Sequence, residues 1–266
     1  MIELLLALLL LPALAIGIWE RVVRGMSVWA WGVYRLTGLV GTPIHEMSHA
    51  LCCFLFGLRI TGMSLYSPNA VDGVLGYVNF RYSPMSLRHS IGLVVQGIAP
   101  LITGAVIVAY GLGIFDLAGA PSQGVMGLLV WMYEVALLSV SQLQAQAFSG
   151  MEGLLLAGFL LIVSMHAIPS WADVKLGLKG MAMLSVMALG VVLLAELFSN
   201  IQLPFTEEAS DIGFQASMWI EEGLWVAVFG AVSVVTLAVL ASVVFVLLPA
   251  ALTYAVAFVR GARGAI

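Results

Sequence analysis

Long apolar segments, each nearly free of charge, constrain the fold of this chain more than any other feature. A helix needs about 20 consecutive apolar residues to cross a membrane. Segments of this kind occur at 2–19, 36–58, 90–112, 150–168, 177–199 and 226–248. Because main-chain polar groups in lipid must bond to one another, such segments form helices. We therefore expect an all-α polytopic membrane protein with about six transmembrane helices.

The composition excludes other classes of protein. Of the 266 residues, 62% are hydrophobic and 9% are charged, whereas about 25% are charged in a typical soluble domain. The chain has 10 basic and 14 acidic residues, which argues against the basic surface of a nucleic-acid-binding protein. The lipid bilayer is the expected surrounding, and we expect no nucleic-acid partner.

A seventh apolar segment, 124–146, contains Glu134 and ends in the polar run 141–146. Basic residues in 59–89, in 169–180 and near the C-terminus place these parts in the cytoplasm by the positive-inside rule. The chain must then cross the membrane an even number of times between residues 89 and 168. The segments 90–112 and 150–168 supply two crossings, so 124–146 is predicted to be an interfacial or re-entrant helix.

Two connecting segments differ from the helices. Residues 59–82 place β-branched and aromatic residues around Pro, Asn and an Asp-Gly pair, which predicts a short β-hairpin-like segment. Residues 200–222 contain five acidic residues and no basic one. They are predicted to form an exposed acidic loop or a short surface helix on the outer side.

The second apolar segment contains His45-Glu46-Met-Ser-His49, an H-E-x-x-H pattern. On a helix, positions i and i+4 share a face, so both imidazoles can bind one metal ion. Glu46 lies beside them and can take a proton from water. Ionisable groups inside apolar segments are costly and usually mark function. A polar cluster that only holds helices together is the alternative.

A hydrolytic zinc site usually has three protein ligands, so a third is needed. The candidates in or beside apolar segments are Cys52, Glu134, Glu152, His166, Asp173 and Glu196. Asp173 is favoured, because Pro169 breaks the helix just before it and can turn its side chain inward. The predicted topology places it on the same side of the membrane as His49. Pairing of Asp173 with Lys175 or Lys179 is the alternative.

These motifs resemble those of the site-2 protease family of intramembrane zinc proteases. Residues 45–51, 56–60 and 63–68 are similar to the family's first motif and the strand-rich segment after it. Residues 97–104 weakly resemble its Gly-Pro helix start. Residues 166–173 resemble its Asn-x-x-Pro followed by Leu-Asp-Gly, with His in place of Asn, a spacing one residue shorter and Val in place of Gly.

The resemblance implies that His45, His49 and Asp173 hold Zn²⁺ and that Glu46 is the general base and then the general acid. It implies a transmembrane protein substrate, cleaved within the membrane. It divides the chain into a first transmembrane helix and connection (1–35), a metalloprotease core (36–180), and C-terminal transmembrane helices with the acidic loop (181–266). We expect a prokaryotic plasma membrane, with the active site toward the cytoplasm.

Further residues are candidates for contacts to the substrate or transition state: His166, Asn69 and Asn79. The strand-like segment can also pair with an extended peptide. Substrate selection would rest on the 200–222 loop, the membrane chamber or a regulatory membrane partner. The alternative function is a catalytically inactive membrane scaffold or assembly subunit with a protease-like fold. A metal transporter is disfavoured, because no chain of polar residues crosses the other helices.

Overall fold

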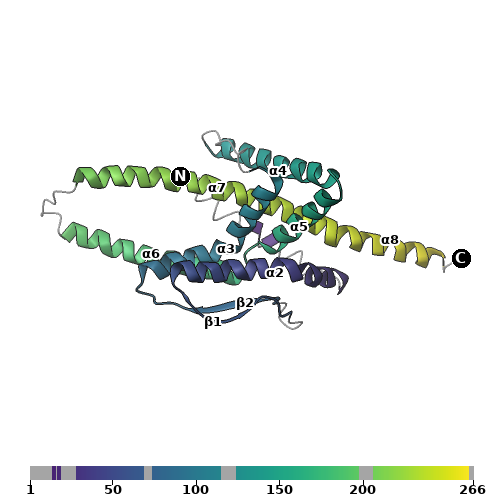
Figure 1. Ribbon diagram of the computed structural model, residues 1–266, viewed down its shortest axis with the longest axis horizontal. Helices are drawn as coiled ribbons and strands as arrows, with labels where there is room; N and C mark the ends of the chain where they lie inside the picture. Colours follow the sequence, from purple (N-terminus) through teal and green to yellow (C-terminus); the bar gives the residue numbers. More distant parts are fainter. Residues whose placement is uncertain are drawn as a thin grey trace.

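The computed structural model describes residues 14–15, 17–18, 28–68, 74–114, 124–197 and 206–263. Most of these residues are helical, which confirms the predicted mostly helical fold (Figure 1). The helices are α2 (Val28–Phe56), α3 (Leu87–Leu112), α4 (Val125–Phe148), α5 (Met151–His166), α6 (Trp171–Leu197), α7 (Thr206–Ser242), the π-helix η1 (Val243–Leu247) and α8 (Leu248–Arg263). The strands are β1 (Arg59–Ser64) and β2 (Tyr77–Arg81).

The predicted hairpin is present and follows directly from the end of α2. Gly57 adopts a left-handed conformation (φ 68°), which stops the helix and turns the chain into β1. β1 and β2 pair antiparallel, from Arg59 opposite Arg81 to Ser64 opposite Tyr77, with an irregularity between Ile60 and Gly62. The hairpin lies alongside α2 (Figure 1).

Among the described residues, fewer helices can cross a membrane than the sequence predicts. Three segments are long and apolar enough: Leu87–Leu112, Val125–Phe148 and Trp225–Phe258. A fourth is counted if α5 and α6, which are bent by 59° at a short break, form one span. The predicted number of about six is therefore not confirmed. α2 is long enough but contains the polar His45–His49 segment.

Several predicted boundaries change. The segments 150–168 and 177–199 were predicted as separate spans, but α5 has only 16 residues, about 24 Å of helix. It forms with α6 either a broken span or a re-entrant loop. α4 is long enough to cross, so its length does not favour the interfacial or re-entrant placement of 124–146.

Two further predictions concern the chain ends and the acidic segment. The first helix, predicted at 2–19, lies almost wholly outside the described residues, and α2 begins at Val28 rather than near 36. Residues 206–222 of the predicted acidic loop belong to the helix α7. No proline interrupts residues 206–242, so the helix continues through the acidic residues into the apolar part.

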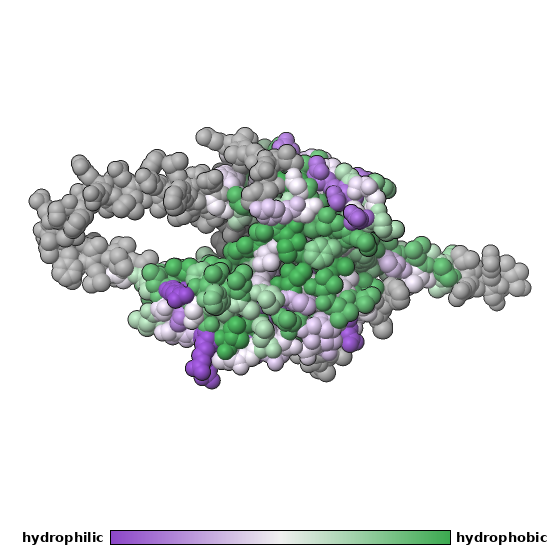
Figure 2. Space-filling model, in the orientation of Figure 1, coloured by the Kyte–Doolittle hydropathy of each residue, from purple (hydrophilic) through white to green (hydrophobic). Residues whose placement is uncertain are grey.

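The apolar core lies among α3, α4, α5 and α7. On the face shown in Figure 2, apolar residues cover the middle of the molecule and the hydrophilic residues lie toward its margins. This distribution is that of a protein surrounded by lipid. The candidate site lies beside this core, where α2, α3, the α5–α6 break and β2 meet.

Candidate metal centre

α2 presents both histidines of the H-E-x-x-H pattern on one face, as helical spacing requires. The imidazole Nε2 atoms of His45 and His49 lie 3.3 Å apart. The two rings meet edge to face, with their centroids 5.0 Å apart. Two ring nitrogens that face each other at this distance can bind one ion together.

The start of α6 places Asp173 opposite these rings. Ser170 and Asp173 form a capping box: the Ser170 main-chain N–H and hydroxyl donate to Asp173 Oδ2 at 2.7 and 2.6 Å. The Asp173 N–H in turn donates to Ser170 Oγ at 3.3 Å. Pro169 precedes the cap and cannot continue α5, so the chain turns at this point. The capping bonds hold the carboxylate through Oδ2, and both of its oxygens face the imidazoles of α2.

Close packing of α3 against α6 sets the position of Asp173. A β-carbon added at Gly97 would lie 2.8 Å from the Gly177 Cα and 2.9 Å from the main-chain oxygen of Asp173. The two helices therefore touch through their backbones, as small residues permit in membrane proteins. Any larger residue at 97 would push α6 and its carboxylate away from α2.

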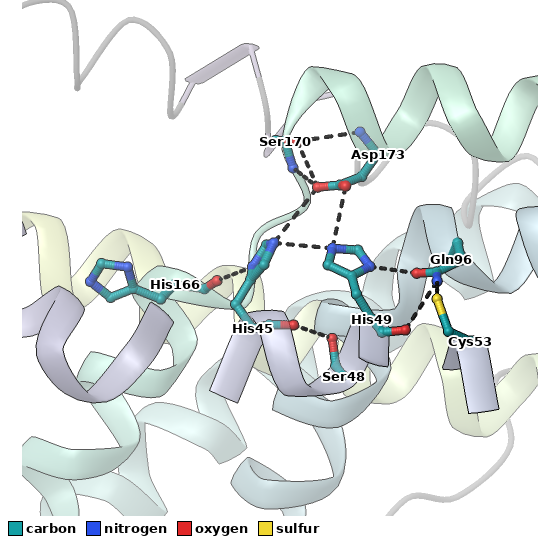
Figure 3. A network of polar contacts seen from close by, with 8 residues as sticks. All are labelled: His45, Ser48, His49, Cys53, Gln96, His166, Ser170 and Asp173. Carbon is teal, nitrogen blue, oxygen red and sulfur yellow. Dashed lines mark hydrogen bonds and ion pairs between the residues drawn. The ribbon is translucent and has the colours of Figure 1, made fainter. Parts of the chain in front are cut away.

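Together these elements form a three-ligand group (Figure 3). Asp173 Oδ1 lies 3.3 Å from His49 Nε2, and Asp173 Oδ2 lies 3.7 Å from His45 Nε2. In a tetrahedral zinc site with bonds of about 2.0–2.1 Å, neighbouring ligand atoms are about 3.3 Å apart. The three side chains thus have the chemistry and the spacing that a zinc ion requires.

The outer nitrogen of each ring is hydrogen-bonded. His45 Nδ1 lies 2.7 Å from the main-chain oxygen of His166, and His49 Nδ1 lies 2.6 Å from Gln96 Oε1 (Figure 3). Since a carbonyl oxygen only accepts, His45 Nδ1 is assigned as the donor. In the neutral imidazole, the lone pair is then on Nε2, which faces the other ligands. This arrangement is typical of metal-binding histidines.

Comparison with known proteins agrees with this geometry. The model of the Peptidase M50B-like family matches residues 18–240. The chain belongs to the Peptidase M50B-like family. This match confirms the site-2 protease resemblance. Together with the apolar helices it identifies the chain as an integral membrane protein of a peptidase family. No curated protein and no solved structure gave a match.

Glu46 of this M50B-like protein is buried on α2 and lines a cleft of about 800 Å³. His45, His49 and Asp173 line the same cleft. The other wall of the cleft is formed by β2 and the residues before it. Gly76 is the point of closest approach, because a β-carbon there would lie 2.8 Å from Glu46 Cγ. Glu46, the three candidate metal ligands and a strand thus share one cleft.

Of the other predicted site residues, the structure describes His166 and Asn79, and both line this cleft. The His166 side chain turns away from the ligands: its Nε2 lies 3.0 Å from Thr37 Oγ1 and its ring stacks on Tyr34. Its main-chain oxygen, not its ring, contacts His45. Asn79 is on β2 and lines the cleft. Asn69 lies outside the described residues.

The other candidate ligands are not part of the group. Among the described residues, the three-ligand cluster contains His45, His49 and Asp173 and no other side chain. The Cys52 thiol is 3.6 Å from the main-chain oxygen of Gly92 on α3. Glu134 and Glu152 are exposed on α4 and α5.

Sequence reasoning missed three residues that shape the site: Ser170, Gln96 and Gly76. The S-x-x-D pattern after Pro169 is a recognisable capping signal, so the role of Ser170 was open to prediction. Gln96 is an amide inside an apolar segment, which by itself marks a polar contact. No local signal identifies Gly76, because its importance comes from the approach of a helix 30 residues earlier.

Proposed function

We propose that this protein is a zinc-dependent intramembrane endopeptidase that cleaves transmembrane segments of membrane protein substrates. The observation that carries the proposal is the convergence of His45 Nε2, His49 Nε2 and the Asp173 carboxylate within 4.8 Å of one another. Zinc bound there would act as a Lewis acid that polarises the scissile carbonyl group. Membership of a peptidase family supports the reaction class.

Glu46 is the residue that would move the proton. In hydrolysis the water oxygen bonds to the carbonyl carbon, the C–N bond breaks, and the departing nitrogen gains a proton. Glu46 would take that proton from water and deliver it to the nitrogen, acting first as base and then as acid. Its place beside both histidines in the cleft supports this role.

β2 would hold the substrate in an extended form. A helix in lipid has its carbonyl groups hydrogen-bonded, so a peptide bond must be unwound before it can be attacked. In the described part of the chain, β2 pairs with β1 only, and residues 76–80 line the cleft. An edge without a partner strand can pair with an extended peptide. We propose that the edge of β2 presents the unwound segment to Glu46 and the ligand group.

The test combines metal content with cleavage. We would purify the wild type, Asp173→Ala and Glu46→Gln in detergent without chelators, and count zinc per chain. Each would then be reconstituted in vesicles with a fluorescently labelled single-span test protein, with an unstructured labelled polypeptide as a second test substrate. We expect about one zinc per chain in the wild type and in Glu46→Gln, and clearly less in Asp173→Ala. We expect only the wild type to cleave the test substrates.

Three results would each contradict part of the proposal. Absence of zinc from the wild type would favour the inactive scaffold. Equal zinc in the wild type and in Asp173→Ala would move the third ligand elsewhere. Cleavage by Glu46→Gln at the wild-type rate would exclude Glu46 as the proton carrier while leaving the metal site in place.

A further inference from the structure

The buried amide side chain of Gln96 on α3 contacts His49 at Nδ1, the ring nitrogen that faces away from His45 and Asp173. Gln96 has no exposed surface. Its Oε1 lies 2.6 Å from His49 Nδ1, and its Nε2 lies 3.0 Å from the His49 main-chain oxygen and 2.9 Å from the Cys53 sulfur (Figure 3). A buried polar side chain is costly unless its polar atoms have partners, and here both ends of the amide have one.

These partners determine which way round the amide lies. The main-chain oxygen of His49 only accepts hydrogen bonds, so the amide group facing it must be the Nε2 donor. Oε1 then faces His49 Nδ1 and can only accept, so Nδ1 carries the ring proton. In the neutral imidazole, the lone pair is therefore on His49 Nε2, which lies 3.3 Å from Asp173 Oδ1.

We propose that Gln96 is a positioning residue of the metal centre, which holds His49 in the Nδ1–H tautomer and aims its Nε2 at the metal. The inference rests on the proposed zinc site but concerns a residue that does not bind the metal. His45 is held in the same way by the main-chain oxygen of His166, which side-chain substitution does not remove. Gln96 is therefore the side chain through which the support of the ligands can be tested.

Three variants separate positioning from packing. Gln96→Met keeps a side chain of similar length but removes the acceptor for His49 Nδ1–H. Gln96→Glu keeps an acceptor oxygen for His49 Nδ1–H, although it exchanges the donor to the His49 main-chain oxygen for a carboxyl oxygen. Ser139→Ala is the matched control, because Ser139 donates to Ser233 at 3.0 Å in a buried contact between α4 and α7, away from the metal centre.

The measurements are metal affinity and geometry in the full chain in detergent. The apparent Kd for Zn²⁺ would be measured by competition with a chelator, and the visible absorption of the Co²⁺-loaded protein would report the coordination. We expect Gln96→Met to weaken zinc binding by about 10- to 100-fold and to alter the Co²⁺ spectrum. We expect Gln96→Glu to recover most of that affinity and Ser139→Ala to match the wild type. Thermal unfolding of each metal-free chain checks that the fold is retained.

The outcomes distinguish the two proposals. Zinc binding by Gln96→Met within about threefold of the wild type, with an unchanged spectrum, would overturn the role of Gln96 and leave the zinc site standing. Affinity in Gln96→Glu as low as in Gln96→Met, with the fold of Gln96→Glu retained in thermal unfolding, would also overturn it. If Gln96→Met does not fold, Gln96→Asn replaces it, because the shorter amide withdraws the acceptor from His49. Failure of the wild type to bind zinc would overturn the zinc site itself, and this inference with it.

Discussion

Replacing Gly76 with alanine tests whether the close approach of the hairpin to Glu46 is required for catalysis. A β-carbon at this position would lie 2.8 Å from Glu46 Cγ and 2.9 Å from both the Ser64 main-chain oxygen and Thr42 Cγ2. Carbon atoms pack without strain at about 3.5–4.0 Å. The strand and its neighbours must therefore separate by about 0.6–1.2 Å, because one of the three neighbours is main chain and the other two belong to a helix.

We expect this separation to lower the rate of cleavage more than the stability of the fold. Overpacking of this kind costs about 1–3 kcal/mol of stability, whereas a misplacement of about 1 Å at a catalytic centre can lower the rate by about 100-fold. None of the three candidate metal ligands is among the three atoms nearest to a β-carbon at Gly76. We therefore expect Gly76→Ala to keep about one zinc per chain and to cleave about 100-fold more slowly.

Gly62 provides the matched control in the same hairpin. A β-carbon there would lie 3.8 Å from Tyr77 Cε2 and 3.9 Å from Asn79 Nδ2, which are ordinary contacts. Zinc per chain and the rate of cleavage of the labelled single-span protein would be compared for the wild type, Gly76→Ala and Gly62→Ala. Wild-type cleavage by Gly76→Ala would refute the reasoning, as would loss of zinc from Gly76→Ala with full zinc in Gly62→Ala.

Three other substitutions test the supports of the site. Gly41→Ala would place a β-carbon against the side chain of His166, whose main-chain oxygen accepts a hydrogen bond from His45. We expect about tenfold weaker zinc binding in chelator competition. Ser170→Ala removes one hydrogen bond to Asp173 and the helix cap; thermal unfolding should show a loss of about 1 kcal/mol, with zinc still bound. Val78→Pro removes a main-chain donor from β2. We expect slower cleavage with zinc retained, and an unchanged rate would argue against substrate pairing at this strand.

The metal-binding face of α2 was predictable from local pattern alone. Residues four apart on a helix share a face whatever the rest of the chain does, so the positions of His45 and His49 relative to each other followed from their spacing. The hairpin followed in the same way from alternating residues and turn signals between the helices. The break between α5 and α6 followed from Pro169, because proline cannot continue the hydrogen-bonding pattern of a helix.

The number of membrane spans was not predictable from length and hydropathy. These properties identify apolar segments, but they do not show whether two neighbouring segments cross separately or bend into one unit. α5 is too short to cross alone, and its 59° bend to α6 decides how the pair is counted. The acidic residues 206–222 likewise belong to α7, because local charge does not end a helix that has no breaking residue.

The sequence alone predicted a helical membrane protein with two candidate metal-ligating imidazoles and a candidate general base on one helix. Pro169 favoured Asp173 as the third ligand, and only the tertiary structure shows that its carboxylate lies beside the two imidazoles. By composition Asp173 was one of several candidates, and it meets His49 because the Gly97 and Gly177 backbones let α6 pack closely on α3. A ligand group requires atoms within a few ångströms of one another. Between segments more than 120 residues apart, only the packing of helices sets such distances.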